Sequence, residues 1–367
     1  MTYSFSTPKF ISRFVARALL TAIIGACWTC PVHAKDGSQK PGKPSREELF
    51  ASNQTLTVAL RAPWDDLVHN KDNPNPYPAE LELTDSQGKA HSIPLTVERR
   101  GLTRQTVCEF PPIRLRFEKS AVKETIFHGQ KSLKLVTHCD VGTRWEQYYV
   151  KEMLAYRMYN LMTERSFRVR PLSITYIESR NNRADSPKFA FLVEDDGDVA
   201  KRNKLKKLDI RWIQPEKLDS LEASRMYLFQ YMIGNVDWSA LKGAGARNCC
   251  HNAKLIGVDP ASKLYAVPYD FDSSGLVDAH YAAPNAGLRI GDVTERLYRG
   301  FCVHNATLET ARQEYLSKEQ AIYDLVKSES RLSSRSEKRA LDYLGEFFDI
   351  LRNDHKFERK IIQRCRK

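Results

Sequence analysis

The most informative stretch of this chain is Tyr231–Gly275, which reads YMIGNVDWSALKGAGARNCCHNAKLIGVDPASKLYAVPYDFDSSG. Two apolar runs in it, Ala253–Val258 and Leu264–Pro268, flank the turn sequence Asp259–Ser262. The proline in that turn fixes φ, and the Asp and Ser side chains can bond their own backbone. The segment therefore predicts a β-hairpin.

The open end of this hairpin is expected to collect oxygen-bearing side chains. Opposed residues of an antiparallel pair lie about 5 Å apart, so Asn252 before the first strand comes close to Asp270 after the second. Upstream, Asp237 follows a helix predicted over Leu221–Ile233, whose start carries a capping pattern at Asp219. One amide and two carboxylates then face a common point.

Such a group of oxygens is suited to a metal-bound phosphate. Magnesium prefers hard oxygen ligands and commonly bridges a protein carboxylate to substrate phosphates, while phosphoryl transfer needs a further carboxylate to orient the acceptor. Asp237, Asn252 and Asp270 could divide these roles. The alternative is that Asp237 caps a turn, Asn252 ends a loop, and Asp270 and Asp272 are solvated.

Three motifs occur here in a particular order: Asn-x-Asp-Trp at Asn235–Trp238, Asn252 before a strand, and Asp-x-Asp at Asp270–Asp272. In this order they resemble the kinase family of spore coat protein H, CotH. The resemblance implies an α+β, two-lobed protein-kinase-like fold with a β-rich N-terminal lobe and a mainly helical C-terminal lobe. It also implies that Asp237 is catalytic and that Asn252, Asp270 and Asp272 bind Mg²⁺ or Mn²⁺.

The resemblance extends to residues that would contact the phosphates of ATP. Arg100-Gly101-Leu102-Thr103-Arg104 looks like the Arg-Gly-x-x-Arg element of the family, and Lys134 with Glu152 resembles the lysine–glutamate pair of protein-kinase-like sites. A tight hairpin end with exposed charge would explain the arginines equally well. Lys134 alternates with apolar neighbours, so it could point into solvent, and Glu152 could face water.

One departure from the family pattern lies between Asp237 and Asn252. Ser239–Cys250 intervenes, whereas kinase loops place the metal-binding Asn about five residues after the catalytic Asp. This insertion could loop out, let Asn248 compete with Asn252, or prevent the site from closing around a nucleotide. The chain has neither a Gly-x-Gly-x-x-Gly loop nor a P-loop motif, so ordinary protein kinases and P-loop enzymes gain no support.

The N-terminus has the pattern of a secretory signal peptide. Basic residues precede the apolar run Ala18–Trp28, and Val32–Ala34 offers a small residue at the cleavage edge. We expect a mature chain that begins at Lys35 and is periplasmic or secreted; the alternative is a lipoprotein modified at Cys27. The apolar run is shorter than the roughly 20 residues of a spanning helix, so no transmembrane span is expected.

Removing residues 1–34 takes away three basic residues and no acidic one, so the net charge falls from +12 to +9. The basic run Lys201–Lys207 could suggest nucleic acid, but the chain has no nucleic-acid-binding module, and an exported protein rarely meets nucleic acid. We expect instead a protein or an anionic envelope component as substrate. The oligomeric state stays open.

Six of the eight cysteines remain in the mature chain, and an even number in an exported protein favours disulfides. Cys108 and Cys139 each adjoin a predicted strand and are expected to pair. A bond between Cys249 and Cys250 is disfavoured because they are adjacent, so we expect them to pair elsewhere, with Cys302 and Cys365 as candidates. A zinc site is disfavoured, and His251 is interpreted as a packed or capping histidine.

Composition and hydrophobic periodicity predict the domain organisation and the positions of the strands and helices. We expect a signal peptide over residues 1–34, a linker over 35–54, the β-rich lobe over 55–195 and the helical lobe over 196–367. Strands are predicted at Leu56–Leu60, Glu80–Leu83, Ile93–Val97, Arg114–Phe117, Leu133–Val136, Leu172–Tyr176 and Phe189–Val193. Helices are predicted at Glu146–Met162, Leu308–Lys327 and Glu337–Arg352.

The sequence therefore predicts an exported phosphotransferase that uses a metal-bound nucleotide to phosphorylate a protein or surface component. Because exported compartments contain little ATP, a catalytically inactive kinase-like binding or envelope-structural protein is the main alternative. Metal-assisted hydrolysis is a third possibility, since a carboxylate site can also activate water on a metal.

Overall fold

The structure is a computed structural model that describes residues 45–101, 103–140 and 142–367. The expected signal peptide, the start at Lys35, the alternative lipidation at Cys27 and the first half of the expected linker, residues 35–44, lie outside the described residues. From Lys43 onward the chain belongs to one unit, and the account below concerns that unit.

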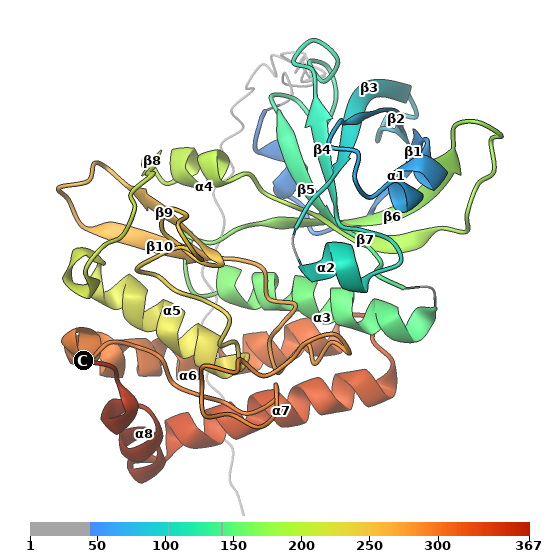
Figure 1. Ribbon diagram of the computed structural model, residues 1–367. Coiled ribbons are helices and arrows are strands. Elements are labelled where there is room, and N and C mark those ends of the chain that lie inside the picture. The colour runs from blue at the N-terminus through green and yellow to red at the C-terminus, as the bar shows by residue number, and fades with distance from the viewer. Residues whose placement is uncertain (1–44, 102, 141) are drawn as a thin grey trace, which may run out of the picture. The chain divides into compact units, whose positions relative to one another are not determined.

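Seven strands in the first half of this unit form a closed barrel (Figure 1). Their order around the barrel is β1-β2-β3-β4-β5-β7-β6, and β6 closes it by pairing in parallel with β1, whereas all other neighbours are antiparallel. The strands are β1 (Leu56–Ala62), β2 (Tyr77–Thr84), β3 (Ala90–Arg99), β4 (Ile113–Phe117), β5 (Ser132–Val136), β6 (Val169–Glu178) and β7 (Lys188–Val193).

This barrel corrects the predicted fold. The structure is α+β overall, but its strands close on themselves instead of forming the open sheet of a two-lobed kinase-like fold. The closing pair sets Leu56 against Leu172 and Ala62 against Glu178, so it joins segments far apart in the sequence. Alternating apolar residues predict where a strand runs but not which strand it pairs with, so periodicity could not reveal the closure.

The barrel interior is one hydrophobic core filled by every second residue of its strands. On β1 these are Val58, Leu60 and Ala62, and on β5 they are Leu133 and Leu135. Side chains between them point outward, so residue 134 of β5 is placed on the outer surface of the barrel.

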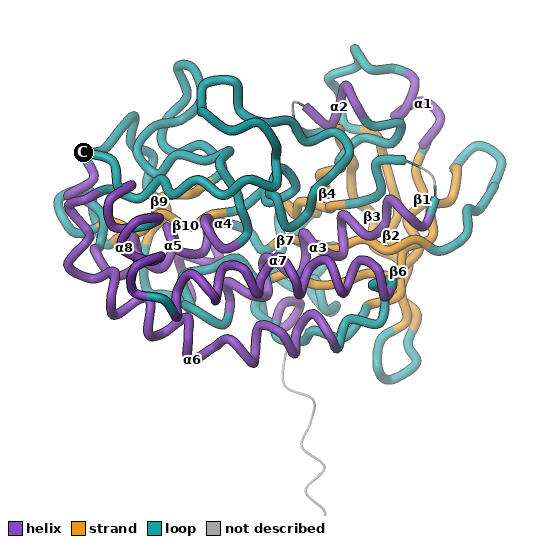
Figure 2. The backbone as a smooth tube through the Cα atoms, turned by 90° about the horizontal axis from the view of Figure 1, so that it is seen from below, coloured by secondary structure: helices purple, strands orange, loops and turns teal. Residues whose placement is uncertain are grey.

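A second core contains the helices. The helix α3 (Thr143–Asn160) lies between β5 and β6 in sequence, yet its buried residues join those of the later helices. The helices lie side by side (Figure 2). Helix α6 contacts α3, α5 and α7, and α5 also contacts α7. These later helices are α5 (Ser220–Met232), α6 (Leu308–Lys327), α7 (Ser334–Arg352) and α8 (Asp354–Lys360).

Several local predictions are confirmed. The hairpin consists of β9 (Ala253–Gly257) and β10 (Leu264–Pro268), joined by a third strand, β8 (Lys206–Lys207). In its turn the Asp259 carboxylate accepts hydrogen bonds from two backbone N–H groups. The Asp219 carboxylate caps α5 by accepting from the N–H of Glu222. Short helices outside the predictions are α1 (Trp64–His69), α2 (Thr103–Val107) and α4 (Asp196–Arg202).

Three disulfides join cysteines of the described chain. The predicted Cys108–Cys139 bond is confirmed. The prediction for the other four was wrong: Cys249 bonds Cys250, and Cys302 bonds Cys365. The backbone bridge between Phe301 and Arg366 brings Cys302 close to Cys365. Because these two cysteines bond each other, Cys249 and Cys250 form the remaining disulfide. Among the described residues, no helix is both long enough and apolar enough to cross a membrane.

Candidate active site

Asp237 is fixed by the turn that ends α5. Gly234 adopts φ +63°, and a Cβ there would overlap the hydroxyl of Tyr343, so this close approach requires glycine. The side chain of Asn235 then accepts a 3.0 Å hydrogen bond from the N–H of Asp237. The N–H of Gly275 donates to Gly234 over 3.2 Å, which ties this turn to the segment that follows β10.

Two neighbours on one segment hold the Asp237 carboxylate. His251 Nε2 lies 2.7 Å from Oδ1, and Asn252 Nδ2 donates to Oδ2 over 2.9 Å and to the Asp237 carbonyl over 2.7 Å. The hydrogen bond from His251 is the main reason why the pKa of Asp237 is lowered, and the same bond raises the pKa of His251. The Asp237 side chain keeps 42% of its surface exposed, so it is accessible from solvent.

Sequence reasoning missed the role of His251. The residue pairs with Ser239 in a short antiparallel bridge, which returns the inserted loop to the start of β9. The signal available in the sequence was its position beside Asn252, since any fold that brought Asn252 to Asp237 would bring His251 with it.

Asp270 lies at the open end of the hairpin, as predicted. The N–H of Tyr269 donates to the carbonyl of Asn252 over 3.0 Å, which places Asn252 one residue from Asp270 along the paired strands. The N–H of Asp270 donates to the hydroxyl of Tyr156 on α3 over 2.9 Å. Asn252 and Asp270 both adopt positive φ, +48° and +66°, a conformation uncommon outside glycine and often found at functional sites.

Asp272 and Glu152 are buried carboxyl groups. Asp272 is 9% exposed and accepts a 3.2 Å hydrogen bond from the hydroxyl of Tyr281. Burial and then the charge of Asp270 raise the pKa of Asp272 to about 6. Glu152, on α3, is 1% exposed, and within the described chain neither of its carboxylate oxygens has a hydrogen-bond partner. Burial and then Asp272 raise the pKa of Glu152 well above its ordinary value.

Arg104 is the cation nearest to Glu152, with Nη1 and Oε2 3.9 Å apart. Its Nη2 donates to the carbonyl of Thr137 over 2.8 Å, and its guanidinium lies 5.5 Å from the centre of the Tyr149 ring. Burial by itself would lower the pKa of Arg104, but Tyr281 and the carboxylates raise it. Glu152 is thus paired with Arg104, whereas the resemblance implied a pair with Lys134.

Lys134 and Arg100 lie on the same side of the site. Lys134 Nζ sits 3.7 Å from the centre of the Tyr269 ring, half-buried on the outer face of the barrel. Burial, and then the charge of Arg100, lower the pKa of Lys134 to about 7, although Asp270 opposes the shift. Arg100 donates through Nε to the carbonyl of Ile113 over 3.3 Å. The hairpin, the barrel and α3 therefore place all eight predicted site residues in one neighbourhood.

The donor atoms fit a hard cation in type. Asn252, Asp270 and Asp272 offer oxygens, and Mg²⁺ commonly needs only one or two protein carboxylates because it keeps several waters. They do not form a closed carboxylate cage. Asn248, the alternative ligand, is engaged elsewhere, since its Nδ2 donates to Asp209 over 2.8 Å.

Another group of possible ligands lies apart from these residues. Within residues 45–101, 103–140 and 142–367, three ligand atoms of His, Cys, Asp or Glu lie within 4.8 Å of one another only at Cys139, Asp140 and His280. The Cys139 sulfur is consumed by a disulfide, so this group offers two ligands at most.

Fold and site together define the chain as an α+β protein with a closed barrel, a helical core and a site lined by carboxylates and cations. No protein-family model matches the chain, and no curated protein matches it.

Proposed function

We propose that the protein is an exported phosphotransferase that moves a phosphoryl group from a metal-bound nucleotide, ATP being the expected donor, to a protein or an envelope component. The motifs that resemble the CotH kinase family motivate the choice of reaction. The observation that carries it is the buried Glu152 carboxyl group, which has no hydrogen-bond partner among the described residues and shares its surroundings with Asp270, Asp272 and Arg104.

A buried carboxyl group without a hydrogen bond is costly even with a cation 3.9 Å away, so a native protein retains it for a reason. A cation brought into the site would offset the repulsion among these acidic groups. Asn252, Asp270 and Asp272 would hold Mg²⁺, and bound Mg²⁺ supplies charge neutralisation for phosphate oxygens.

Arg100 and Lys134 are assigned to the phosphates. The Lys134 amine has a pKa of about 7 and no ion-pair partner within the described residues, so an arriving phosphate would favour its charged form. Arg104 has a positioning role, since it is already held by Thr137 and Glu152.

Asp237 is assigned to the acceptor hydroxyl. Its lowered pKa keeps it ionised at neutral pH, so it can accept a hydrogen bond from the hydroxyl and then its proton. His251 and Asn252 hold the carboxylate in one orientation, which favours a productive geometry.

The deciding experiment is a nucleotide titration of the disulfide-bonded protein, with and without Mg²⁺, followed by a transfer assay. Asp270→Ala should abolish Mg²⁺-dependent nucleotide binding, whereas Asp237→Ala should suppress transfer and largely preserve binding. Asp259→Asn, at the opposite end of the same hairpin, is the matched control and should change neither. Absence of nucleotide binding to the unaltered protein with either Mg²⁺ or Mn²⁺ rejects the proposal.

One observation favours the alternative of a catalytically inactive binding or envelope-structural protein. Both oxygens of Asp237 already accept hydrogen bonds, from His251 and from Asn252, and the lowered pKa that results makes the carboxylate a weaker base toward a substrate hydroxyl. Nucleotide binding without any transfer, unaltered in Asp237→Ala, would support this second function.

A further inference from the structure

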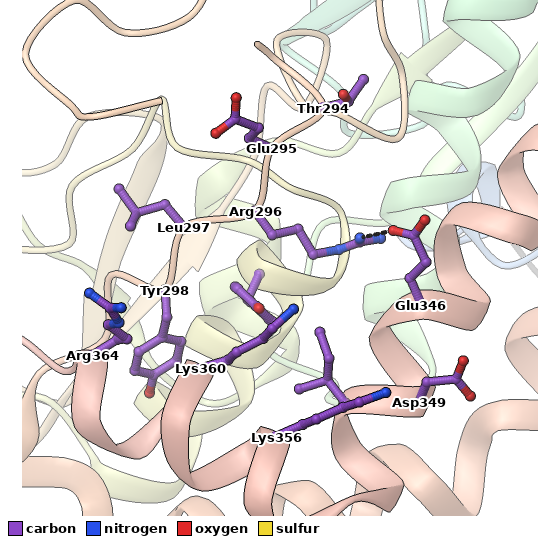
Figure 3. A pocket seen from close by; sticks show the side chains of 12 residues that line it. Thr294, Glu295, Arg296, Leu297, Tyr298, Glu346, Asp349, Lys356, Lys360 and Arg364 are labelled. Carbon is purple, nitrogen blue, oxygen red and sulfur yellow. Dashed lines mark hydrogen bonds and ion pairs between the residues drawn. The ribbon is translucent and has the colours of Figure 1, made fainter. Parts of the chain in front are cut away.

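A cavity of about 540 Å³ lies apart from the candidate active site, and none of the eight site residues lines it (Figure 3). It is bordered by α5, α7, α8 and the loop over residues 294–298. Pockets for small molecules commonly have volumes of about 300–1,000 Å³, so this one has room for a ligand of moderate size.

Three cations line one side of this cavity. Lys356 and Lys360 lie on successive turns of α8, and Arg364 ends the 3₁₀ helix η4 (Ile362–Arg364) that follows (Figure 3). Within the described part of the chain, none of these three side chains makes an ion pair or a hydrogen bond. Like charges four residues apart on a helix repel each other, so the arrangement costs stability unless an anion is bound.

The carboxylates around the cavity do not neutralise these cations. Glu346 is paired with Arg296 over 2.8 Å, and Asp349 with Arg352 over 2.6 Å. The remaining one, Glu295, accepts a 3.0 Å hydrogen bond from a backbone N–H. Each acidic group thus has a partner of its own, whereas Lys356, Lys360 and Arg364 have none among the described residues.

The other wall of the cavity is aromatic and apolar. Tyr231 and Tyr298 are buried there beside Ile350, and within the described chain the buried hydroxyl of Tyr298 has no hydrogen-bond partner. A ring or carbon skeleton could pack against these side chains while its anionic groups met the cations.

We propose that this cavity binds a phosphorylated small molecule that carries at least two phosphate groups. Several phosphates are required because the cations are spread over two turns of helix, and side chains four residues apart are separated by about 5–6 Å at Cβ. Lysine and arginine both bind phosphate through charge-assisted hydrogen bonds. The inference is independent of the proposed phosphotransferase activity, since it uses none of the same residues.

The test uses the full chain and inorganic tripolyphosphate as probe, measured by calorimetry at 0.15 M salt with a chelator present. The triple variant Lys356→Gln/Lys360→Gln/Arg364→Gln should weaken binding by roughly tenfold or more. The triple variant Lys119→Gln/Lys123→Gln/Lys131→Gln removes the same charge from the barrel surface, and its affinity should stay within about twofold of the unaltered protein.

Two further variants separate this cavity from other anion sites. Leu297→Trp leaves every charge in place but fills part of the cavity, and it should weaken binding as well. Arg100→Gln/Lys134→Gln alters the candidate active site and should leave binding unchanged. The proposal is overturned if the unaltered protein shows no saturable binding, if both triple variants lose affinity equally, or if only Arg100→Gln/Lys134→Gln loses it.

Discussion

The Oδ1 atom of Asp237 accepts a 2.7 Å hydrogen bond from Nε2 of His251. This contact joins the turn after α5 to the segment before β9, and it shifts the two pKa values in opposite directions. A carboxylate held in this way is ionised at neutral pH and has a defined orientation. The pair therefore fixes the orientation of the candidate catalytic carboxylate.

The His251 imidazole should titrate above its ordinary pKa of 6.5 in the folded protein, because the Asp237 carboxylate favours the charged ring. A group with a raised folded pKa contributes stability below its unfolded pKa, and loses that contribution as the pH rises through the folded value. NMR titration should show the pKa of His251 falling toward 6.5 in Asp237→Asn. An unchanged titration would refute the contact, and Asp259→Asn serves as the control.

Asp272→Asn should stabilise the protein at neutral pH. The folded pKa of Asp272 is about 6 and its ordinary value 3.8, so the cost of burying the ionised group develops as the pH rises from about 4 to 6 and persists above that. We expect a gain of roughly 1–3 kcal/mol in the free energy of unfolding at pH 7 and little change at pH 4. Urea unfolding at the two pH values measures this; equal destabilisation at both would contradict it.

Lys134→Met should also stabilise the protein, with a different pH dependence. The pKa of Lys134 falls from 10.5 to about 7 on folding, so the cost of desolvating the charged amine is fully present below pH 7 and disappears as the pH approaches 10.5. The gain in melting temperature should be larger at pH 6 than at pH 10. Lys131→Met, an exposed position just before β5, should show no such trend.

The three disulfides should differ in their contribution to stability. The sequence separations are 63 for Cys302–Cys365 and 31 for Cys108–Cys139. For loops of these sizes, the lost entropy of the unfolded chain predicts that each disulfide stabilises the folded protein by about 4 kcal/mol. The Cys249–Cys250 bond has a separation of 1 and closes no such loop. When both cysteines of one disulfide are replaced by serine, denaturant unfolding should therefore show the smallest loss in the free energy of unfolding at Cys249–Cys250. A loss there as large as at Cys302–Cys365 would contradict this ranking.

Local elements of the fold followed from the sequence because their causes are local. Leu308–Lys327 was predicted with its observed bounds, since apolar residues at helical spacing specify a helix without reference to its partners. The hairpin followed from its turn residues, and α5 from its cap at Asp219. The short β8 gave no such signal, since its two residues are both lysines and exposed.

The site could be predicted in part for the same reason. Asn252 and Asp270 flank one hairpin, so their proximity needs only local pairing. Lys134 and Glu152 were expected to meet, but Glu152 lies against Arg104. The difference arises because the direction of a side chain from the barrel, and its distance from α3, depend on how these elements pack.

The sequence by itself determined the elements, the hairpin and the order of the motifs along the chain, because short-range backbone preferences and hydrophobic periodicity act over a few residues. Only the tertiary structure decided that β1 and β6 close a barrel, that His251 holds Asp237 and that Cys249 bonds Cys250. Each of these depends on which segments share a core and which partners remain within reach, and burial of apolar surface is non-directional. Periodicity shows that a residue will be buried, and only the packing of the elements decides which residues it contacts.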